Sequence, residues 1–305
     1  MPSPSPSPSP SPMPMPMPMP SPSWPGLDGA VVLITGGTRG VGAGIARSFR
    51  AAGATVLTCG RTEPAEPPVG EFVACDVREP EQVSALVEAV VSRHGRLDVL
   101  VNNAGGAPPV PAADASPRFH AAVIGLNLLA PLLVAQAVYP VMCDQDGGGV
   151  IIMVSSVSGR RPSPGTAAYG AAKAGLESLT ASLAVEWAPQ VRVNALAVGL
   201  VRTEQAHLHY GDADGLAAVG RTVPLGRLAE PEEVGACAVF LASPLASYVT
   251  GATLAVHGGG ERPAFLAAAN TGNTGNTGGG SVLKPATQCA ESPDSREVLG
   301  GGTRR

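Results

Sequence analysis

Short apolar runs alternate with amphipathic segments through the middle of the chain. Runs rich in Val, Leu, Ile and Ala indicate buried strands, and apolar residues three or four positions apart indicate helices. The apolar runs predict strands at residues 30–34, 55–59, 72–74, 97–101, 150–154, 191–197 and 253–256. Helices are predicted at residues 41–52, 79–93, 121–142, 167–188 and 231–241. Strands separated by helices predict an α/β domain built on a doubly wound, mostly parallel sheet.

The two ends of the chain lack this pattern. Twelve of the 31 prolines fall within residues 1–25, which alternate Pro with Ser or Met and offer no apolar face. Residues 264–305 are rich in Gly, Asn and Thr, with too few apolar positions to offset the entropy of ordering. We therefore expect a disordered proline-rich arm at 1–25, one folded domain at 26–263 and a disordered tail at 264–305. A folded part of about 240 residues suits a single α/β domain.

Charge and cysteine content narrow the class of protein. The chain has 20 basic and 24 acidic residues, a net charge of -4, and no block of Lys or Arg, which argues against nucleic-acid binding. Its five cysteines are widely spaced without a CxxC pair, so neither a disulfide framework nor a zinc site is indicated. The first residues lack the basic start and apolar core of a secretory signal. We therefore expect reduced thiols and a cytoplasmic protein.

The most apolar segment, residues 121–142, is long enough to cross a membrane. Asn127, Pro131, Gln136 and Pro140 interrupt it, and no basic residues flank it. It also lies within the regular alternation of strands and helices. We therefore expect a helix buried on most sides, in the core or at a subunit contact, and no membrane span.

A glycine-rich turn follows the first predicted strand and opens the first predicted helix. It reads TGGTRGVG and contains Gly36, Thr38, Arg39, Gly40, Val41 and Gly42. Glycines at these spacings let the backbone approach a pyrophosphate, which the amides and the dipole of a helix N-terminus favour. The spacing differs from GxGxxG, and glycine-rich turns also occur as plain connections, so the turn alone leaves both interpretations open.

Further motifs follow the turn in a fixed order. They are Asp76, NNAG at 102–105, Asn127, Ser156, Tyr169 and Lys173. Over residues 27–260 this constellation resembles the short-chain dehydrogenase/reductase family. The resemblance implies a Rossmann-like domain, a nicotinamide cofactor, and hydride transfer between that cofactor and an alcohol or carbonyl compound.

Tyr169 and Lys173 are four residues apart on a predicted helix, so they share one face. The pKa of a free tyrosine, about 10, is too high for easy proton exchange near neutrality. An adjacent ammonium group and an oxidised nicotinamide would favour the phenolate, which makes Tyr169 a candidate general acid or base. A core tyrosine beside a solvated lysine is the simpler explanation of an isolated YxxxK pair, and the surrounding motifs reverse that preference.

Ser156 and Asn127 complete the catalytic set that the resemblance implies. Ser156 ends a predicted strand thirteen residues before Tyr169, as in the family, and its hydroxyl can polarise a substrate carbonyl. Its neighbours Ser155 and Ser158 could equally be turn formers. A proline at position 131 has no N–H, which frees the backbone oxygen of Asn127 from helical bonding. In the family, that oxygen holds a water linking the lysine to solvent.

The predicted cofactor-binding set follows from the turn and from the resemblance. It comprises Gly36, Thr38, Arg39, Gly40, Val41, Gly42, Arg61, Asp76, Val77, Asn103, Ala104, Gly105, Tyr169, Lys173, Val201 and Thr203. By resemblance, Asp76 contacts the adenine, and Ala104 and Gly105 pass close to the ribose. Thr203, near the end of VGLVRT, is expected at the nicotinamide carboxamide, although Val198 replaces the family's usual proline at the start of this motif. Without the resemblance, Asp76 would be a helix-start carboxylate and 104–105 a tight turn.

The residues after the second predicted strand bear on the choice of cofactor. Gly60 stands where an NAD-binding site places an acidic residue, so no carboxylate there repels a ribose phosphate. Arg61 and Arg39 could clamp a 2′-phosphate with charge-assisted bonds. The alternatives are two surface arginines, with Glu63 pairing with Arg61 or reaching the ribose itself. We expect NADP(H) to be preferred, with NAD(H) as the alternative cofactor.

Residues 204–225 correspond to a mobile lid over the substrate in the family. His207 and His209 form an HxH pair, but no third ligand is evident, so we expect no metal site. Arg160 and Arg161 either attract an acidic substrate, such as an acyl thioester, or form a solvated turn.

Together these features predict an enzyme that transfers a hydride between NADP(H) and a secondary alcohol or its ketone. A 3-oxoacyl thioester and a cyclic ketone are among the candidate substrates. The resemblance implies a homotetramer or homodimer, and neither nucleic acid nor a membrane is an expected partner. The alternative is a non-catalytic nucleotide-binding sensor or scaffold of the same fold, with the proline-rich arm as its interaction element. The presence of Ser156, Tyr169 and Lys173 favours the enzyme.

Overall fold

A computed structural model describes residues 26–261 and 263. By its internal contacts the chain divides into residues 1–262 and 263–305, and the sheet and its helices belong to the first unit. The predicted proline-rich arm at 1–25 and the predicted tail at 264–305 lie outside the described residues.

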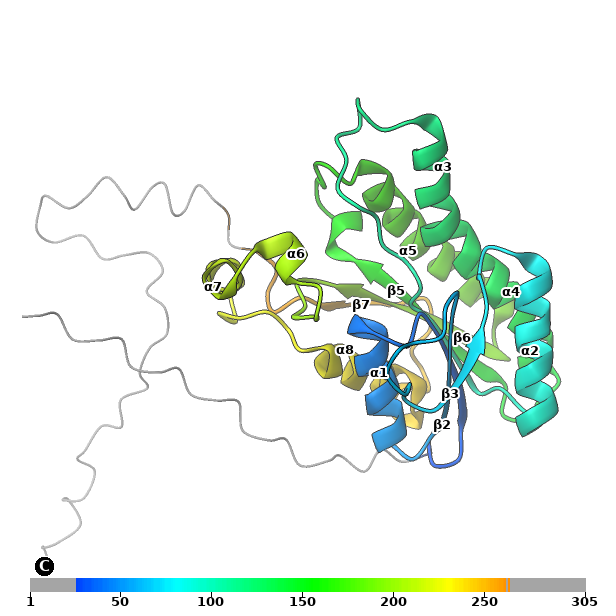
Figure 1. Ribbon diagram of the computed structural model, residues 1–305. Helices are drawn as coiled ribbons and strands as arrows, with labels where there is room; N and C mark the ends of the chain where they lie inside the picture. Colours follow the sequence, from blue (N-terminus) through cyan, green and yellow to red (C-terminus); the bar gives the residue numbers. More distant parts are fainter. Residues whose placement is uncertain (1–25, 262, 264–305) are drawn as a thin grey trace, which may run out of the picture. The chain divides into compact units, whose positions relative to one another are not determined.

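Seven strands of the described chain form one sheet in the order β3-β2-β1-β4-β5-β6-β7, and all neighbouring strands run parallel (Figure 1). The strands are β1 Val31–Thr35, β2 Thr55–Gly60, β3 Glu71–Ala74, β4 Val99–Asn102, β5 Gly149–Ser156, β6 Val191–Val198 and β7 Thr253–Val256. The order runs outward from β1 to β3 and then returns to β4 beside β1. Loops after β1 and β4 therefore diverge at a crevice, which is where open parallel sheets bind ligands.

Helices cover both faces of the sheet. They are α1 Gly40–Ala51, α2 Pro80–His94, α3 Pro117–Ile124, α4 Ala130–Cys143, α5 Ala167–Trp187, α6 His207–Tyr210, α7 Ala213–Thr222 and α8 Pro231–Ala242. Helices α1 and α8 pack together on one face, and α2, α4 and α5 lie on the other (Figure 1). The predicted doubly wound α/β fold is confirmed. The short α6 and α7 lie in the stretch where no element was predicted.

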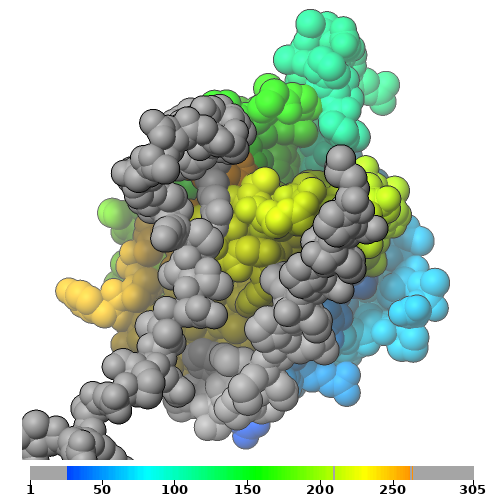
Figure 2. Space-filling model, turned by 90° about the vertical axis from the view of Figure 1, so that its left-hand side faces the viewer, coloured from blue at the N-terminus to red at the C-terminus, as the bar shows by residue number. Residues whose placement is uncertain are grey.

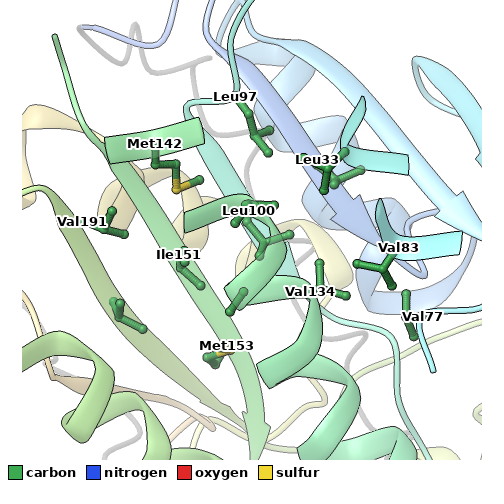
Figure 3. Close-up of a cluster of buried hydrophobic side chains, with 14 of the residues drawn as sticks. Leu33, Val77, Val83, Leu97, Leu100, Val134, Met142, Ile151, Met153 and Val191 are labelled. Atoms are coloured by element: carbon green, nitrogen blue, oxygen red, sulfur yellow. The ribbon is translucent and has the colours of Figure 1, made fainter. Parts of the chain in front are cut away.

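Two apolar clusters fill the space between the sheet and its helices. On the α2–α4–α5 face, Leu33, Leu100 and Ile151 from the strands meet Val134 and Met142 from α4, all fully buried (Figure 3). Strands covered on both sides must be apolar at nearly every position, and β1, β4 and β5 meet that requirement. This explains why continuous apolar runs identified the strands.

The segment predicted as one helix at 121–142 is interrupted, so that prediction is wrong in detail. It consists of α3, a π-helical turn at Gly125–Leu129, and α4. Pro131 has no N–H to donate to the carbonyl of Asn127, and the helix widens in the turn that precedes it. The side chain of Asn127 is fully buried at the widened turn.

This segment is partly buried within the protomer. The run Pro117–Cys143 is long and apolar enough to span a membrane by length and composition, but only 39% of its most apolar window is buried within the protomer. Val134, Val138 and Met142 pack fully buried against the sheet, whereas Leu129 is 57% exposed. The segment thus has one face in the core and another that is open.

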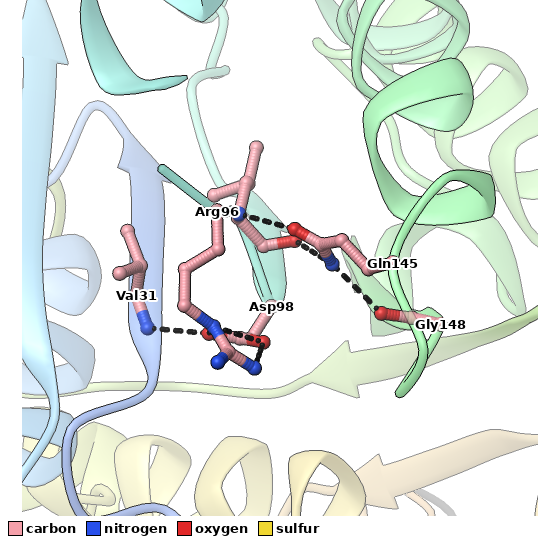
Figure 4. A network of polar contacts seen from close by, with 6 residues as sticks. Val31, Arg96, Asp98, Gln145 and Gly148 are labelled. Atoms are coloured by element: carbon pink, nitrogen blue, oxygen red, sulfur yellow. Dashed lines mark hydrogen bonds and ion pairs between the residues drawn. The ribbon is translucent and has the colours of Figure 1, made fainter. Parts of the chain in front are cut away.

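A polar network joins the amino ends of the central strands (Figure 4). The Asp98 carboxylate accepts a hydrogen bond of 2.8 Å from the backbone N–H of Val31 and is held by Arg96 at 2.6 Å. The side chain of Gln145 bonds both backbone groups of Leu97 and the carbonyl of Gly148. These bonds tie β1, β4 and the start of β5 together at the amino edge of the sheet.

Candidate active site

The glycine-rich turn is packed too tightly for side chains at its key positions. A Cβ atom on Gly42 would lie 2.2 Å from the carbonyl oxygen of Gly36, and Gly36 itself has φ +63°. The Asn103 amide donates to the carbonyls of Thr35 and Gly36, each at 3.0 Å. The turn is therefore braced from the loop after β4, and its backbone is open for the close approach of a phosphate.

The same bracing positions the predicted ribose-binding residues. The hydroxyl of Thr35 accepts hydrogen bonds of 3.0 Å from the backbone N–H groups of Asn103 and Ala104. A Cβ on Gly105 would lie 2.6 Å from Oδ1 of Asn127 and 3.4 Å from Nζ of Lys173. The loop after β4 thus passes between the two predicted catalytic residues Asn127 and Lys173, and only glycine fits at position 105.

Asn127 fastens this loop to the helices. Its side-chain amide donates to the carbonyls of Gly106 and Val123, and its Oδ1 accepts from the N–H of Gly106 at 2.8 Å. Sequence reasoning singled out the backbone oxygen of Asn127. The bonds of its side chain add a structural role that the sequence pattern did not indicate.

Ser156, Tyr169 and Lys173 come together at the carboxyl edge of β5. Ser156 is the last residue of β5, and Tyr169 and Lys173 lie on the first turns of α5. The side chains of Ser156 and Tyr169 lie close enough for the Ser156 hydroxyl to lower the pKa of Tyr169. The ammonium group of Lys173 lies 5.6 Å from the centre of the Tyr169 ring and donates to the carbonyl of Val154 at 2.7 Å.

Burial shifts the pKa values of both titrating groups toward their neutral forms. Burial around the hydroxyl raises the pKa of Tyr169 above its ordinary value of 10.0, and the Ser156 hydroxyl opposes that rise. Burial lowers the pKa of Lys173 from 10.5 to about 8. Near neutral pH the phenol is therefore protonated and able to donate a proton, while Lys173 still carries most of its charge.

The Glu177 carboxylate, which was not a predicted site residue, bonds side chains next to this catalytic group. Glu177, one turn after Lys173 on α5, accepts hydrogen bonds from the Ser155 hydroxyl at 2.9 Å and from Arg160 at 2.8 Å. The Ser155 hydroxyl also lies 3.1 Å from the carbonyl of Lys173. Glu177 thus joins the end of β5, helix α5 and the turn between them. Its i+4 spacing from Lys173 was the available signal.

Asp76, the predicted adenine contact, already has a side-chain partner. Its carboxylate accepts from Arg78 at 2.5 Å and 2.9 Å, and this interaction above all holds the pKa of Asp76 below its ordinary value. The charge of Arg61 acts in the same direction, so Arg61 lies within electrostatic range of Asp76. Val77 beside them is buried. Arg78 was not among the predicted site residues.

Arg39 and Arg61, the predicted phosphate clamp, are both exposed. Among the described residues, the ion pairs involve neither of them, nor Glu63. The alternative in which Glu63 neutralises Arg61 is therefore not the arrangement in this structure. Arg39 directly precedes α1, and Arg61 directly follows β2.

The segment after β6 lies over the turn. A Cβ on Gly40 would be 3.5 Å from the methyl group of Thr203, and the N–H of Gly40 donates to Oε1 of Glu204 at 2.8 Å. Val201, buried, pairs with Ala229 as an isolated bridge that anchors the start of this segment. Figure 2 shows α6 and α7, in yellow-green, on the outer surface of this face.

His207 takes part in this segment rather than in a metal cluster. Its Nδ1 lies 2.8 Å from the carbonyl oxygen of Glu204. Within residues 26–261 and 263, no group of three or more His, Cys, Asp or Glu side chains could hold a metal ion.

The two arginines near the site are paired with carboxylates. Arg160 pairs with Glu177, and Arg161 pairs with Glu261 at 2.6 Å. Glu261 follows three glycines, 258–260, all with positive φ, which turn the chain after β7 back toward the β5–α5 turn. Tyr210 of α6 lies within electrostatic range of Arg161, Glu261 and Tyr169. The sequence analysis did not associate Glu261 or Tyr210 with the site.

A parallel sheet with a glycine-rich turn at its crevice and a Ser–Tyr–Lys group beside it defines a dinucleotide-dependent oxidoreductase. The comparisons with known proteins specify the family. A family model described as enoyl-(acyl carrier protein) reductase matches residues 36–261. The chain belongs to the short-chain dehydrogenase/reductase family.

Individual relatives agree with this assignment. An uncharacterized oxidoreductase of Mycobacterium tuberculosis, MT0954, is 39% identical over 243 residues, which cover 76% of this chain and 92% of the relative. The D-threitol dehydrogenase of Mycolicibacterium smegmatis is 36% identical over 76% of this chain and 93% of its own length. The ligand-free aldohexose dehydrogenase of Thermoplasma acidophilum superposes with a TM-score of 0.74 at 30% identity, covering 77% of this chain and 95% of that structure.

The chain is therefore an oxidoreductase that acts on CH–OH groups with a nicotinamide cofactor, NAD(P). The residues present fit such a cofactor. A side chain on Gly42 would collide with the turn, which leaves the backbone there bare for a phosphate. The loop that carries Ala104 and Gly105 is held beside the turn by Asn103.

Proposed function

We propose that this enzyme interconverts a neutral secondary alcohol and its ketone, with Tyr169 as the general acid and base. The observation that carries this proposal is the Tyr169 phenol, which lies near the Ser156 hydroxyl and has its ring 5.6 Å from the buried ammonium group of Lys173. When bound, the cofactor supplies or accepts the hydride.

In the direction of reduction, the Ser156 hydroxyl holds the substrate carbonyl oxygen and polarises it. The Tyr169 hydroxyl transfers its proton to that oxygen as the carbonyl carbon accepts the hydride. The positive charge of Lys173 then stabilises the phenolate that remains. In oxidation the phenolate takes the proton of the alcohol, and Asn127 keeps the loop after β4 in place beside Lys173.

The cofactor proposal is NADP(H) in preference to NAD(H). Gly60 at the end of β2 puts no carboxylate beside the ribose, and Arg39 and Arg61 are exposed and outside the ion pairs of the described chain. A guanidinium group suits a phosphate because it donates several hydrogen bonds in a fixed plane. Asp76 would reach the adenine after exchanging part of its contact with Arg78.

The proposed substrate is neutral because both nearby arginines already have carboxylate partners. An anionic substrate would have to displace Glu261 from Arg161 or Glu177 from Arg160. Hydroxyl-rich compounds such as threitol and an aldohexose are the substrates that the names of two relatives give. We propose neutral polyols, sugars and simple ketones ahead of 3-oxoacyl thioesters.

We further propose a cytoplasmic homodimer or homotetramer in which the open faces of α4 and α5 meet a second copy. Leu129 at the start of α4 is 57% exposed, and Val185 on α5 is 81% exposed. Large apolar side chains in such positions are typical of subunit contacts.

The proposal is tested by measuring the change in nicotinamide absorbance when the enzyme is mixed with NADP(H) or NAD(H) and each member of a substrate panel. The panel contains threitol, an aldohexose, a cyclic ketone, a simple secondary alcohol and a 3-oxoacyl thioester. Turnover of a neutral compound with NADP(H) supports the proposal. Cofactor binding without any turnover would instead support a nucleotide-binding sensor, and a preference for the thioester would contradict the neutral substrate.

A further inference from the structure

The N–H groups at the start of helix α1 have no acidic side chain close to them in sequence. The N–H groups in the first turn of a helix have no acceptor within that helix, so they attract a negative group. Helix α1 has no acidic residue in its first turn, and the Arg39 side chain provides no cap. A negative group that binds these N–H groups must therefore come from another part of the chain or from a ligand.

Glu204 provides that anion. Its Oε1 accepts the hydrogen bond from the N–H of Gly40 at 2.8 Å, across 164 positions of sequence. The adjacent Thr203 lies directly over Gly40, at ordinary contact distance from where a Cβ atom would be. A carboxylate thus holds a donor of the turn that is expected to receive the diphosphate of a dinucleotide.

We propose that Glu204 is an internal plug of the cofactor site, which the diphosphate of the incoming dinucleotide must displace. The inference rests on the cofactor site of the proposed function. Two anions cannot share one amide N–H without strong repulsion, so Glu204 lowers the affinity of the site for the cofactor. When no cofactor is bound, the Glu204 carboxylate is the partner of the first N–H of α1.

Displacement of Glu204 is coupled to the substrate side of the site. The carbonyl of Glu204 is bonded by the ring of His207, the first residue of α6. The same helix ends at Tyr210, which lies within electrostatic range of Tyr169. Glu204 is therefore connected through α6 to a group that acts on the proposed catalytic tyrosine.

The experiment compares wild-type enzyme with Glu204→Gln and Glu204→Ala. Glu88→Gln, at an exposed position on α2, is the matched control that changes net charge equally. NADPH fluorescence gives the Kd of the cofactor, and calorimetry gives the Kd values of ADP, which carries a diphosphate, and of adenosine, which carries none. Both Glu204 variants remove the carboxylate that competes for the Gly40 N–H and repels the diphosphate. The Kd of NADPH and of ADP should therefore fall by about three- to tenfold. Adenosine binding should not change.

Each other outcome overturns the inference. Equal or weaker binding of NADPH by both Glu204 variants would show that Glu204 does not oppose the cofactor. An equal gain in NADPH affinity in Glu88→Gln would assign the effect to net charge. An equal gain in adenosine affinity in the Glu204 variants would assign it to a general loosening of the site. Wild-type enzyme that binds neither NADPH nor NADH would reject the proposed function itself, and the plug with it.

Discussion

Tyr169 is the residue on which the proposed chemistry depends most directly. Its phenol lies near the Ser156 hydroxyl, and burial raises its pKa, which keeps it protonated near neutrality. It belongs to α5 and not to the glycine-rich turn that we propose as the diphosphate site. Rate and cofactor affinity should therefore be separable at this position.

We expect Tyr169→Phe to lower kcat by about 100- to 10,000-fold, the usual contribution of a positioned acid or base. The Kd of NADPH should change less than about twofold, which is below the free energy of one hydrogen bond. Tyr139→Phe is the control, because Tyr139 stacks on Trp187 at 4.6 Å and its ring is retained. Near-normal turnover by Tyr169→Phe would refute the mechanism.

Lys173 illustrates the cost of a buried charge. Its pKa is about 8 in the folded protein and 10.5 in its ordinary state, so the unfolded chain holds the extra proton between those values. Stability contributed at this position therefore rises with pH from about 8 to 10.5. We expect wild-type stability relative to Lys173→Met to increase by about 2 kcal/mol between pH 7 and pH 10. Urea unfolding of both proteins across this range measures the difference, and a constant difference would exclude the shifted pKa.

Arg61 tests the cofactor preference. If it bonds a 2′-phosphate, Arg61→Ala should lower kcat/KM for NADPH by about ten- to a hundredfold, as expected for a bond to a charged group, and leave NADH unaffected. Arg47→Ala is the control, because that exposed arginine pairs with Glu232. An equal loss with both cofactors would show that Arg61 does not read the phosphate.

At the scale of the elements, side chains next to the proposed catalytic residues hold the junction between β5 and α5. Glu177 bonds both Ser155 and Arg160, and its side chain is only 17% exposed. Removal of its charge leaves Arg160 without that partner and loosens the residue next to Ser156. Glu177 is thus a positioning residue.

Glu177→Gln should lower the free energy of unfolding by about 1–3 kcal/mol, the cost of breaking a largely buried charged bond. It should reduce kcat more than it raises KM, because Ser156 and Tyr169 lose alignment while the cofactor site is intact. Urea unfolding and steady-state kinetics test both parts. A variant with lower stability but unchanged kcat would limit Glu177 to a structural role.

The elements also show what the sequence pattern can predict. Apolar runs located the central strands β1, β4 and β5 because strands buried on both faces leave few polar positions, and shorter apolar runs also located the partly exposed edge strands β3 and β7. Helical periodicity continues through the break between α3 and α4, so the pattern predicted one helix, and only Pro131 indicated that the bonding is interrupted at Asn127. Likewise, YxxxK spacing placed Tyr169 and Lys173 on one face. Periodicity carries no information about contacts such as Gly40–Glu204, which join residues from distant elements.

At the scale of the whole molecule, the open face of α4 and α5 predicts self-association. Light scattering should give the mass of a dimer or tetramer. Leu129→Glu or Val185→Glu should shift the mass toward the monomer, because each buries a charge in the proposed contact. Leu245→Glu is the control at another exposed apolar position, 62% exposed on the turn after α8. A monomeric wild-type protein would contradict the proposed assembly.

The bonds among Val31, Arg96, Asp98 and Gln145 have a consequence for how new specificities could arise. They secure the strands at the amino edge, while Ser156, Glu204, Tyr210 and Glu261 gather at the carboxyl edge or in the segments beyond it. Mutations that reshape residues 204–225 therefore leave the bonds of the amino edge intact. This division lets one scaffold explore many substrates by substitution in a few connecting segments, at little risk to folding.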